Sequence, residues 1–215
     1  MEGQNYRRTE IIVIDDGSTD ESAQIIQKYA LDDPRIIYIH TENRGVSSAR
    51  NTGLLRATGI YVTFLDADDL MSENYLQMMI SQIGNADVCV CKKVRWNQRT
   101  RRSRVDGWPE FRGSKEELRR NLFAYQRSMR GATGRLYKMS LIKEHDIRFR
   151  EDLNYSEDMH FNYAFFRYIS NAVFLDAPLY TYRIHNKQSL TSLDHTFFLK
   201  QWHTQKKCMV EAFGK

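Results

Sequence analysis

Short apolar runs alternate with amphipathic stretches along the first 95 residues of the chain. Four runs have the length and apolar content of buried strands: residues 10–14, 35–39, 60–65 and 86–94. Helical spacing or capping residues mark the segments between them: residues 18–31, a segment from about Ala49 to Gly59, and residues 72–83. This repetition predicts an α/β fold with a mostly parallel sheet, right-handed crossovers and helices on both faces.

The second half of the chain has a less regular pattern. Further helices are expected over residues 114–127, 157–169 and 195–213, and further strands over residues 136–138, 172–176 and 179–183. The pairs Ser18 with Glu21 and Ser114 with Glu117 have the spacing of capping boxes, which predicts helix starts at both serines. No internal repeat or long linker interrupts the sequence, so we expect a single domain.

The composition is that of a globular protein, with 41% apolar and 27% charged residues. No run approaches 18 apolar residues, so no membrane-spanning helix is expected. The three cysteines (Cys89, Cys91 and Cys208) form no C-x-x-C pair, which argues against a disulfide framework or a zinc site. We therefore expect buried, reduced thiols and a cytoplasmic protein.

Positive charge is concentrated in one segment of a chain whose net charge is +5. Between Lys92 and Arg104 there are seven basic residues and no acidic one, with Trp96 among them. Such a segment can contact anionic lipid, nucleic acid or a phosphorylated substrate, and it can also be a solvated loop.

Acidic residues follow two of the predicted strands. Asp15 and Asp16 end the first run, and Asp66, Asp68 and Asp69 end the third. Ligands of α/β sheets bind beyond the carboxyl ends of strands, so both clusters are candidate binding residues. A D-x-D pair can hold Mg²⁺ or Mn²⁺. It can also be a turn, or contain the nucleophile of a haloacid-dehalogenase phosphatase, although those enzymes place the motif in their first strand.

Four motifs in this order make the pattern specific. They are Ile12–Asp20 (IVIDDGSTD), Asn43–Gly53 (NRGVSSARNTG), Thr63–Asp69 (TFLDADD) and Ser156–Asp158 (SED). Together they resemble the inverting family 2 glycosyltransferases, which have the Rossmann-like GT-A fold. The segment Pro178–Arg183 (PLYTYR) also resembles the closing segment of that family. The resemblance covers nearly the whole chain.

The resemblance implies a role for each motif residue. Asp15 and Asp16 would contact the nucleotide base, Arg50 would lie beside the nucleotide, and Asp66 would approach the ribose. Asp68 would bind the metal that bridges the two phosphates.

Three later residues complete the implied site. Asp158 would be the general base on the acceptor hydroxyl, although an acid at a helix N-terminus is also favoured by the helix dipole alone. Arg183 would clamp phosphate, and His185 would add a metal ligand or a phosphate contact.

The implied reaction moves a sugar from a nucleotide-diphospho-sugar, UDP-linked by expectation, to an acceptor hydroxyl with inversion and with Mg²⁺ or Mn²⁺. Residues 1–95 would form the nucleotide-sugar half, and residues 96–215 the acceptor half with a C-terminal helix. The usual setting is bacterial surface polysaccharide synthesis, with a saccharide or lipid-linked acceptor, peripheral contact at the inner membrane face and no nucleic-acid partner. A nucleotide-binding module without turnover and a phosphatase are the alternatives. Self-association is left open.

The sequence departs from the family pattern in two places. Family members open with a strand that lies between the runs at 11–14 and 60–65, and this sequence begins at the second strand. Without it we expect two unpaired strand edges, unless another segment fills the position. The family also often has a tryptophan near the position of Gly134, where this chain has small residues.

Overall fold

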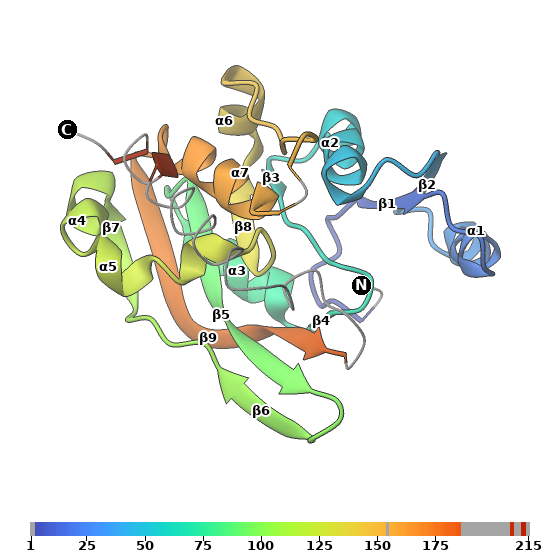
Figure 1. Ribbon diagram of the computed structural model, residues 1–215, viewed down its shortest axis with the longest axis horizontal. Coiled ribbons are helices and arrows are strands. Elements are labelled where there is room, and N and C mark those ends of the chain that lie inside the picture. The colour runs from blue at the N-terminus through green and yellow to red at the C-terminus, as the bar shows by residue number, and fades with distance from the viewer. Residues whose placement is uncertain (1–2, 154, 186–206, 209–211, 214–215) are drawn as a thin grey trace.

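The computed structural model describes residues 3–153, 155–185, 207–208 and 212–213 (Figure 1). The helices are α1 (Ser22–Asp32), α2 (Val46–Arg56), α3 (Tyr75–Ile83), α4 (Lys115–Arg120), α5 (Leu122–Tyr125), the 3₁₀ turn η1 (Ser128–Arg130), α6 (Met139–Glu144) and α7 (Glu157–Phe166). The strands are β1 (Ile11–Asp16), β2 (Ile36–Thr41), β3 (Tyr61–Val62), β4 (Leu70–Met71), β5 (Val88–Asn97), β6 (Arg102–Val105), β7 (Phe111–Ser114), β8 (Arg135–Lys138) and β9 (Asn171–Ile184).

The main sheet has the strand order β3-β8-β5-β9-β4, with β6 added on β5 and β7 added on β9. The α/β class is confirmed, but the expectation of a mostly parallel sheet is wrong for the described strands. Only β1–β2 and β5–β9 are parallel pairs. The reason is that β8 enters between β3 and β5 antiparallel to both, and so breaks the series of parallel crossovers.

Alternating residues of β5 build a hydrophobic core on each face of this sheet. Val88 and Val90 pack in the cluster that contains Phe161 and Phe165 of α7. Cys89 and Cys91 point to the opposite face, into the cluster of α3. Helices therefore cover both faces, as expected. Both cysteines are free thiols, and burial raises their pKa to about 12, which keeps them uncharged at neutral pH.

The strands β1 and β2 form a separate two-stranded sheet. Their register is parallel, from Ile11 opposite Ile36 to Asp16 opposite Thr41. No described strand hydrogen-bonds β1 on its other side, and β3 pairs only with β8. The unpaired edges expected from the sequence are therefore present within the described part of the chain. In Figure 1 this pair lies to one side of the main sheet, with α2 above it and α1 beyond it.

Several predicted boundaries shift for local reasons. The helix predicted from Ser18 begins at Ser22, because the Ser18 N–H donates to Asp15 Oδ1 at 2.8 Å instead of opening the helix. The capping box of Ser114 and Glu117 is present as predicted. The two strands predicted on either side of Pro178 are one strand, β9, which shifts its register opposite Lys92 where the proline has no N–H to donate.

The basic segment is not a loop but a β-hairpin of β5 and β6, paired from Val94 with Val105 to Asn97 with Arg102. It projects from the lower edge of the molecule in Figure 1. Most of the predicted C-terminal helix, residues 195–213, falls outside the described residues. Among the helices that are described, none has the length and apolar character required to cross a bilayer.

Candidate functional site

The first acidic pair ends β1 and is held by the protein itself. Asp15 is 3% exposed. Its Oδ1 accepts from the Ser18 N–H, and its Oδ2 accepts from the Tyr38 hydroxyl at 2.8 Å and lies 3.0 Å from His40 Nδ1. The hydrogen bonds from Ser18, and then those from His40 and Tyr38, hold the pKa of Asp15 well below its usual value despite burial. Asp15 is therefore an anion that fixes the end of β1 against β2.

Asp16 joins the end of β1 to the start of α2. Its two carboxylate oxygens accept from the backbone N–H groups of Arg44 and Gly45 at 2.9 and 2.8 Å. Gly45 has a φ of 89°, a conformation that favours glycine. The carboxylate thus fixes the turn from which α2 carries Arg50 into the site.

Arg50 connects the acids of two distant motifs. Its Nη2 donates to Asp66 Oδ1 at 2.8 Å, and its Nη1 donates to Asp158 Oδ1 at 2.5 Å. Glu157 is a further partner at 3.8 Å. The Arg50 side chain is only 10% exposed, whereas that of Asp66 is 37% exposed. The structure therefore brings Arg50, Asp66 and Asp158 together around one guanidinium.

The charges of this cluster influence each other. Burial opposes the charged form of Arg50, but the carboxylates of Asp158 and Asp66 outweigh it and raise the pKa of the guanidinium. Burial, reinforced by neighbouring Asp158, raises the pKa of Glu157. Among the residues that the structure describes, no group donates a hydrogen bond to Asp158 Oδ2. That oxygen is therefore available to accept a proton.

The second half of the D-x-D motif faces the end of β9. Asp68 Oδ2 lies 3.4 Å from His185 Nε2, and Gln98 Oε1 lies 2.9 Å from the other ring nitrogen of His185. Arg183 donates from Nε to the backbone carbonyl of Asp68. The candidate metal ligands Asp68 and His185 and the candidate phosphate clamp Arg183 are thus neighbours.

The donor set at Asp68 fits a divalent cation in part. A carboxylate oxygen and an imidazole nitrogen are both ligands of Mn²⁺, and phosphate oxygens can supply further positions. Within the described ranges, no group of three or more His, Cys, Asp or Glu side chains is arranged to hold a metal ion. A cation at this place would therefore depend on its substrate for much of its coordination.

Asp69 has a structural role that the motif did not reveal. It is 5% exposed, and it accepts from the Tyr180 hydroxyl at 2.6 Å and from the Arg183 N–H at 2.9 Å. Burial raises its pKa. Asp69 thereby anchors the D-x-D loop to β9 and positions Arg183. Nothing in the sequence distinguished Asp69 from Asp66 and Asp68, because the partners of Asp69 lie more than 100 positions away.

Asn51 was also missed as a part of the site. It is 7% exposed and pairs with the backbone of Phe149: its amide donates to the carbonyl at 2.8 Å, and its side-chain oxygen accepts from the N–H at 2.9 Å. This pair ties α2 to the segment that leads to α7. Its position next to Arg50 in the A-R-N triplet was the only available signal.

Comparison with known families assigns the chain to a family. The model of the family described as Glycosyl transferase family 2 matches residues 2–146, more than half of the chain. A second family model, Acyl-CoA thioesterase, matches residues 118–212. That segment covers less than half of the chain, so this match does not establish a second family. Its strands β8 and β9 belong to the same sheet as β3 and β5, which lie in the segment matched by the first family.

Curated relatives extend the match beyond the family model. EpsJ of Bacillus subtilis, an uncharacterized glycosyltransferase, is 33% identical over 214 residues, which cover 95% of this chain and 60% of EpsJ. The glycosyltransferase GlyA of Streptococcus pneumoniae is 33% identical over 192 residues, 84% of this chain and 27% of GlyA. The chain thus spans less than two thirds of these relatives.

Solved structures show the same fold. TarS of S. aureus, residues 1–349 in complex with UDP-GlcNAc, superposes with a TM-score of 0.78 at 22% identity over 98% of this chain and 60% of that one. The mannosyltransferase PcManGT of Pyrobaculum calidifontis, in complex with GDP-Man and Mn²⁺, superposes with a TM-score of 0.62 at 19% identity over 99% of this chain and 56% of that one. The motifs, the arrangement of their acids and these matches lead to one conclusion: the chain belongs to glycosyltransferase family 2 and has the GT-A fold.

Proposed function

We propose that this chain transfers a sugar from a UDP-linked donor to an acceptor hydroxyl with inversion at the sugar carbon. The observation that carries the proposal is Arg50, which holds Asp66 of the D-x-D motif and Asp158 of the S-E-D motif on one guanidinium. A donor-binding acid and a candidate base therefore lie within one side-chain length of each other. Inverting transfer needs this proximity, because a single displacement brings donor and acceptor together.

In this proposal Asp158 is the general base. Arg50 fixes its Oδ1, and Oδ2 takes the proton of the attacking hydroxyl. A base so placed contributes about 10²–10⁴-fold to the rate. Asp66 approaches the ribose, and Arg50 lies beside the nucleotide and keeps both carboxylates in position.

The departing diphosphate requires positive charge. Arg183, which is fixed by Asp69 and by the backbone of Asp68, is the proposed phosphate clamp. Asp68 and His185 would hold Mg²⁺ or Mn²⁺, which when bound stabilises the leaving diphosphate. The Mn²⁺ in the PcManGT complex supports the use of a metal in this fold.

The proposal places Asp15 and Asp16 near the nucleotide base. The oxygens of Asp16 already accept from two backbone N–H groups, but each has a second lone pair for a base N–H. The Asp15 side chain is fully buried, so in this proposal it acts on the base through the end of β1 that it fixes. The complexes of TarS with UDP and with UDP-GlcNAc support a uridine nucleotide as the donor. In this proposal residues 1–95 supply most of the donor half of the site. Residues 96–215 supply the acceptor half with Asp158, and they also return Arg183 and His185 to the donor diphosphate.

Thermal unfolding of the chain with nucleotides tests this proposal. UDP with Mn²⁺ is expected to raise the Tm, and UDP with a chelator is expected to have a much smaller effect. GDP and CDP with Mn²⁺ are the specificity controls. If none of the three nucleotides raises the Tm in the presence of metal, the proposal is wrong. Release of UDP from a UDP-sugar then separates an enzyme from a binding module without turnover, whereas family membership already argues against the phosphatase alternative.

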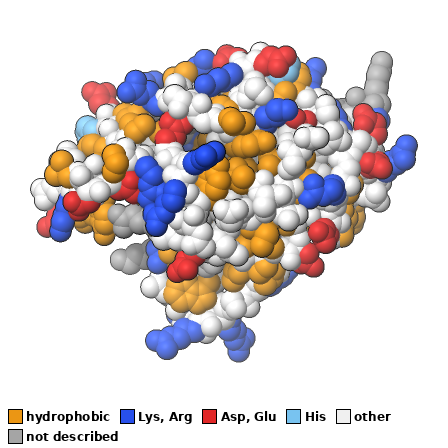
Figure 2. All heavy atoms as spheres, turned by 180° about the vertical axis from the view of Figure 1, so that it is seen from behind, with side chains coloured by type: hydrophobic (Ala, Val, Ile, Leu, Met, Phe, Trp, Pro, Cys, Tyr) orange, Lys and Arg blue, Asp and Glu red, His pale blue; other side chains and the backbone are white. Residues whose placement is uncertain are grey.

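The setting proposed is surface polysaccharide synthesis, with a saccharide or lipid-linked acceptor at the membrane face. The β5–β6 hairpin supports this setting by its charge. The side chains of Arg99, Arg101, Arg102 and Arg104 are exposed, and none of them forms an ion pair with another described residue. Figure 2 shows Lys and Arg side chains at the lower end of the molecule, where the hairpin projects. Lys206 of the basic C-terminal pair lies outside the described residues, and Lys207 is exposed.

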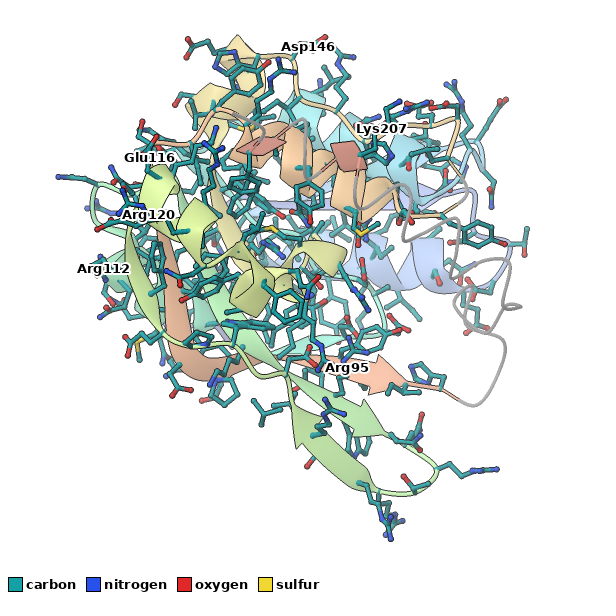
Figure 3. All side chains as sticks on the ribbon, turned by 60° about the vertical axis from the view of Figure 1, so that its left-hand side comes forward. Arg95, Arg112, Glu116, Arg120, Asp146 and Lys207 are labelled. Atoms are coloured by element: carbon teal, nitrogen blue, oxygen red, sulfur yellow. The ribbon has the colours of Figure 1, made fainter. Side chains whose placement is uncertain are left out.

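Sedimentation with vesicles tests membrane contact. Substitution of all four hairpin arginines by Gln should abolish binding to vesicles that contain phosphatidylglycerol and leave the UDP response intact. The matched control replaces four exposed arginines outside the hairpin, Arg119, Arg120, Arg148 and Arg150, and should still bind. Figure 3 shows Arg120 and Asp146 far from Arg95 at the base of the hairpin. Equal loss in both variants would mean that net charge, not the hairpin, drives sedimentation.

A further inference from the structure

Two cations, one half-buried and one buried, lie beside the proposed base, and the proposed chemistry uses neither. Lys93 is half-buried in β5, and Arg135, the first residue of β8, is only 1% exposed. They are 42 positions apart in the sequence and come together because β5 and β8 are neighbours in the sheet. Each cation raises the free energy needed to charge the other, because like charges repel. Their proximity therefore destabilises the protein unless an anion compensates for it.

No carboxylate in the described part of the chain pairs with either cation. Lys93 Nζ donates to Thr133 Oγ1 at 2.8 Å and lies 5.5 Å from the centre of the Tyr180 ring. Arg135 donates from Nε to the carbonyl of Gly131 at 2.8 Å. Its Nη1 is buried and has no hydrogen-bond partner among the described residues. Buried cations are normally paired with acids, so two neighbouring cations without an ion pair leave positive charge that an anionic ligand could neutralise.

Gly131 places this positive charge next to Asp158. A Cβ on Gly131 would lie 2.8 Å from Lys93 Nζ and 3.9 Å from Asp158 Oδ2. The ammonium group and the unengaged oxygen of the proposed base therefore approach the same point. Only a residue without a side chain leaves this space open. If a hydroxyl of a bound molecule reaches Asp158 Oδ2, a substituent of that molecule next to the hydroxyl can reach Lys93 Nζ.

We propose that Lys93, supported by Arg135 beneath it, binds an anionic group of the acceptor close to the hydroxyl that is glycosylated. This inference rests on the proposed function and adds the chemical class of the acceptor: a sugar or lipid-linked sugar that carries a phosphate or a carboxylate. Lys93 would contact the anion. Arg135 is too deeply buried to do so, and it acts by raising the positive potential at Lys93 and by holding the Gly131 carbonyl.

The protonation state of Lys93 is compatible with this role. Burial, and then the neighbouring Arg135, lower its pKa to about 8, while Asp158 and Asp66 oppose the shift. The amine is therefore still mostly charged at neutral pH. An anion that binds there replaces lost hydration with an ion pair, which is why a half-buried ammonium discriminates strongly between charged and neutral ligands.

The donor diphosphate is the competing source of an anion, and the experiment separates the two. Binding of N-acetylglucosamine 1-phosphate and of neutral N-acetylglucosamine is measured by calorimetry on the full chain saturated with UDP and Mg²⁺. The sugar phosphate should bind at least tenfold more tightly than the neutral sugar. Lys93→Gln should abolish this preference, and Lys93→Arg should retain most of it. Lys92→Gln is the matched control, because neighbouring Lys92 pairs with Asp176 at the surface.

The affinity for UDP gives the second readout. It should be the same in wild type, Lys93→Gln and Lys92→Gln, and this also shows that the variants fold. A tenfold loss of UDP affinity in Lys93→Gln alone would assign Lys93 to the donor and overturn the inference. Equal affinity of the wild type for the sugar phosphate and the neutral sugar, with normal UDP binding, would also overturn the inference. A wild type that binds no UDP would instead overturn the proposed function.

A labelling experiment on the wild type keeps the inference testable if Lys93→Gln does not fold. Lys93 should react with an amine-acylating reagent at pH 8, as read by peptide mass spectrometry. With UDP and Mg²⁺ present, the sugar phosphate should protect Lys93 but not Lys92, and the neutral sugar should protect neither. Full protection by UDP alone, with no further effect of the sugar phosphate, would contradict an acceptor site.

Discussion

The guanidinium of Arg50 and the carboxylate of Asp158 are 108 positions apart in the chain and 2.5 Å apart in the structure. Arg50 lies in the middle of α2, and Asp158 lies in the first turn of α7. The pair therefore joins the helix that follows the β1–β2 unit to a helix packed on the main sheet. Because β1 and β3 share no hydrogen bonds, contacts of this kind hold the two sheets together.

Replacement of Arg50 by Gln should therefore affect both stability and activity. Asp66 and Asp158 would face each other without the charge that neutralises them, and the free energy of unfolding should fall by about 1–3 kcal/mol. UDP-sugar turnover should be lost as well, because nothing would orient Asp158. Urea unfolding and UDP release measure the two effects.

Arg148→Gln is the control for this change. Arg148 pairs with Asp146 at the surface, where both side chains are more than half exposed. Exposed pairs contribute little, so no measurable change in the urea midpoint is expected. If Arg50→Gln is as stable as this control, the bridge does not hold the two parts of the site together.

Asp158→Asn should separate binding from turnover. Asn retains the shape of Asp and an oxygen that can accept from Arg50, so the Tm increase with UDP and Mn²⁺ should persist. Turnover should fall by about 10²–10⁴-fold, the usual contribution of a general base. Glu157→Gln is the neighbouring control and should cause a much smaller loss. A larger loss in Glu157→Gln would move the role of base to Glu157.

Metal dependence should be traced to Asp68 and His185. Asp68→Ala removes the carboxylate but keeps the backbone carbonyl that accepts from Arg183. We expect the Mn²⁺ concentration for the half-maximal UDP response to rise at least tenfold, and His185→Gln to cause a smaller rise in the same direction. Asp176→Ala removes an exposed acid elsewhere and should leave the metal titration unchanged. An unchanged titration in Asp68→Ala would exclude Asp68 as a ligand.

Much of this fold could be predicted because local sequence specifies local structure. The apolar run before Asp15 and the polar turn after it define β1, and the capping box at Ser114 defines the start of α4. Long-range pairing could not be predicted in the same way. The antiparallel entry of β8 between β3 and β5 depends on tertiary packing, and a four-residue strand such as Arg135–Lys138 carries no signal for its direction.

The site shows the same division. Residues within one motif, such as Asp66 and Asp68, were recognisable from their spacing at the end of an apolar run. The long-range partners of site residues were not recognisable. Tyr180, which donates to Asp69, and Thr133, which accepts from Lys93, lie far away in the sequence and have no motif of their own. The Asp15 carboxylate was predicted as a ligand contact, and the structure adds a structural role that only the positions of Tyr38 and His40 reveal.

That structural role of Asp15 predicts a pH dependence. Its pKa is lowered in the folded protein, so the ionised carboxylate stabilises the fold at any pH above the usual Asp value of about 4. This stabilisation is lost as the pH falls below that value toward the lowered folded-state pKa. Asp15→Asn should lower the free energy of unfolding at pH 7 by about 1–3 kcal/mol, because Ser18, Tyr38 and His40 lose a charged acceptor.

The difference between wild type and Asp15→Asn should shrink as the pH falls from 5 to 2, and urea unfolding at each pH measures it. The exposed Asp32 of α1 supplies the control: Asp32→Asn should follow the wild-type curve throughout. A constant difference across this range would mean that Asn fails for its shape and not for its charge. In that case the hydrogen bonds at the end of β1, and not the ionisation of Asp15, would be what fixes the β1–β2 unit in place.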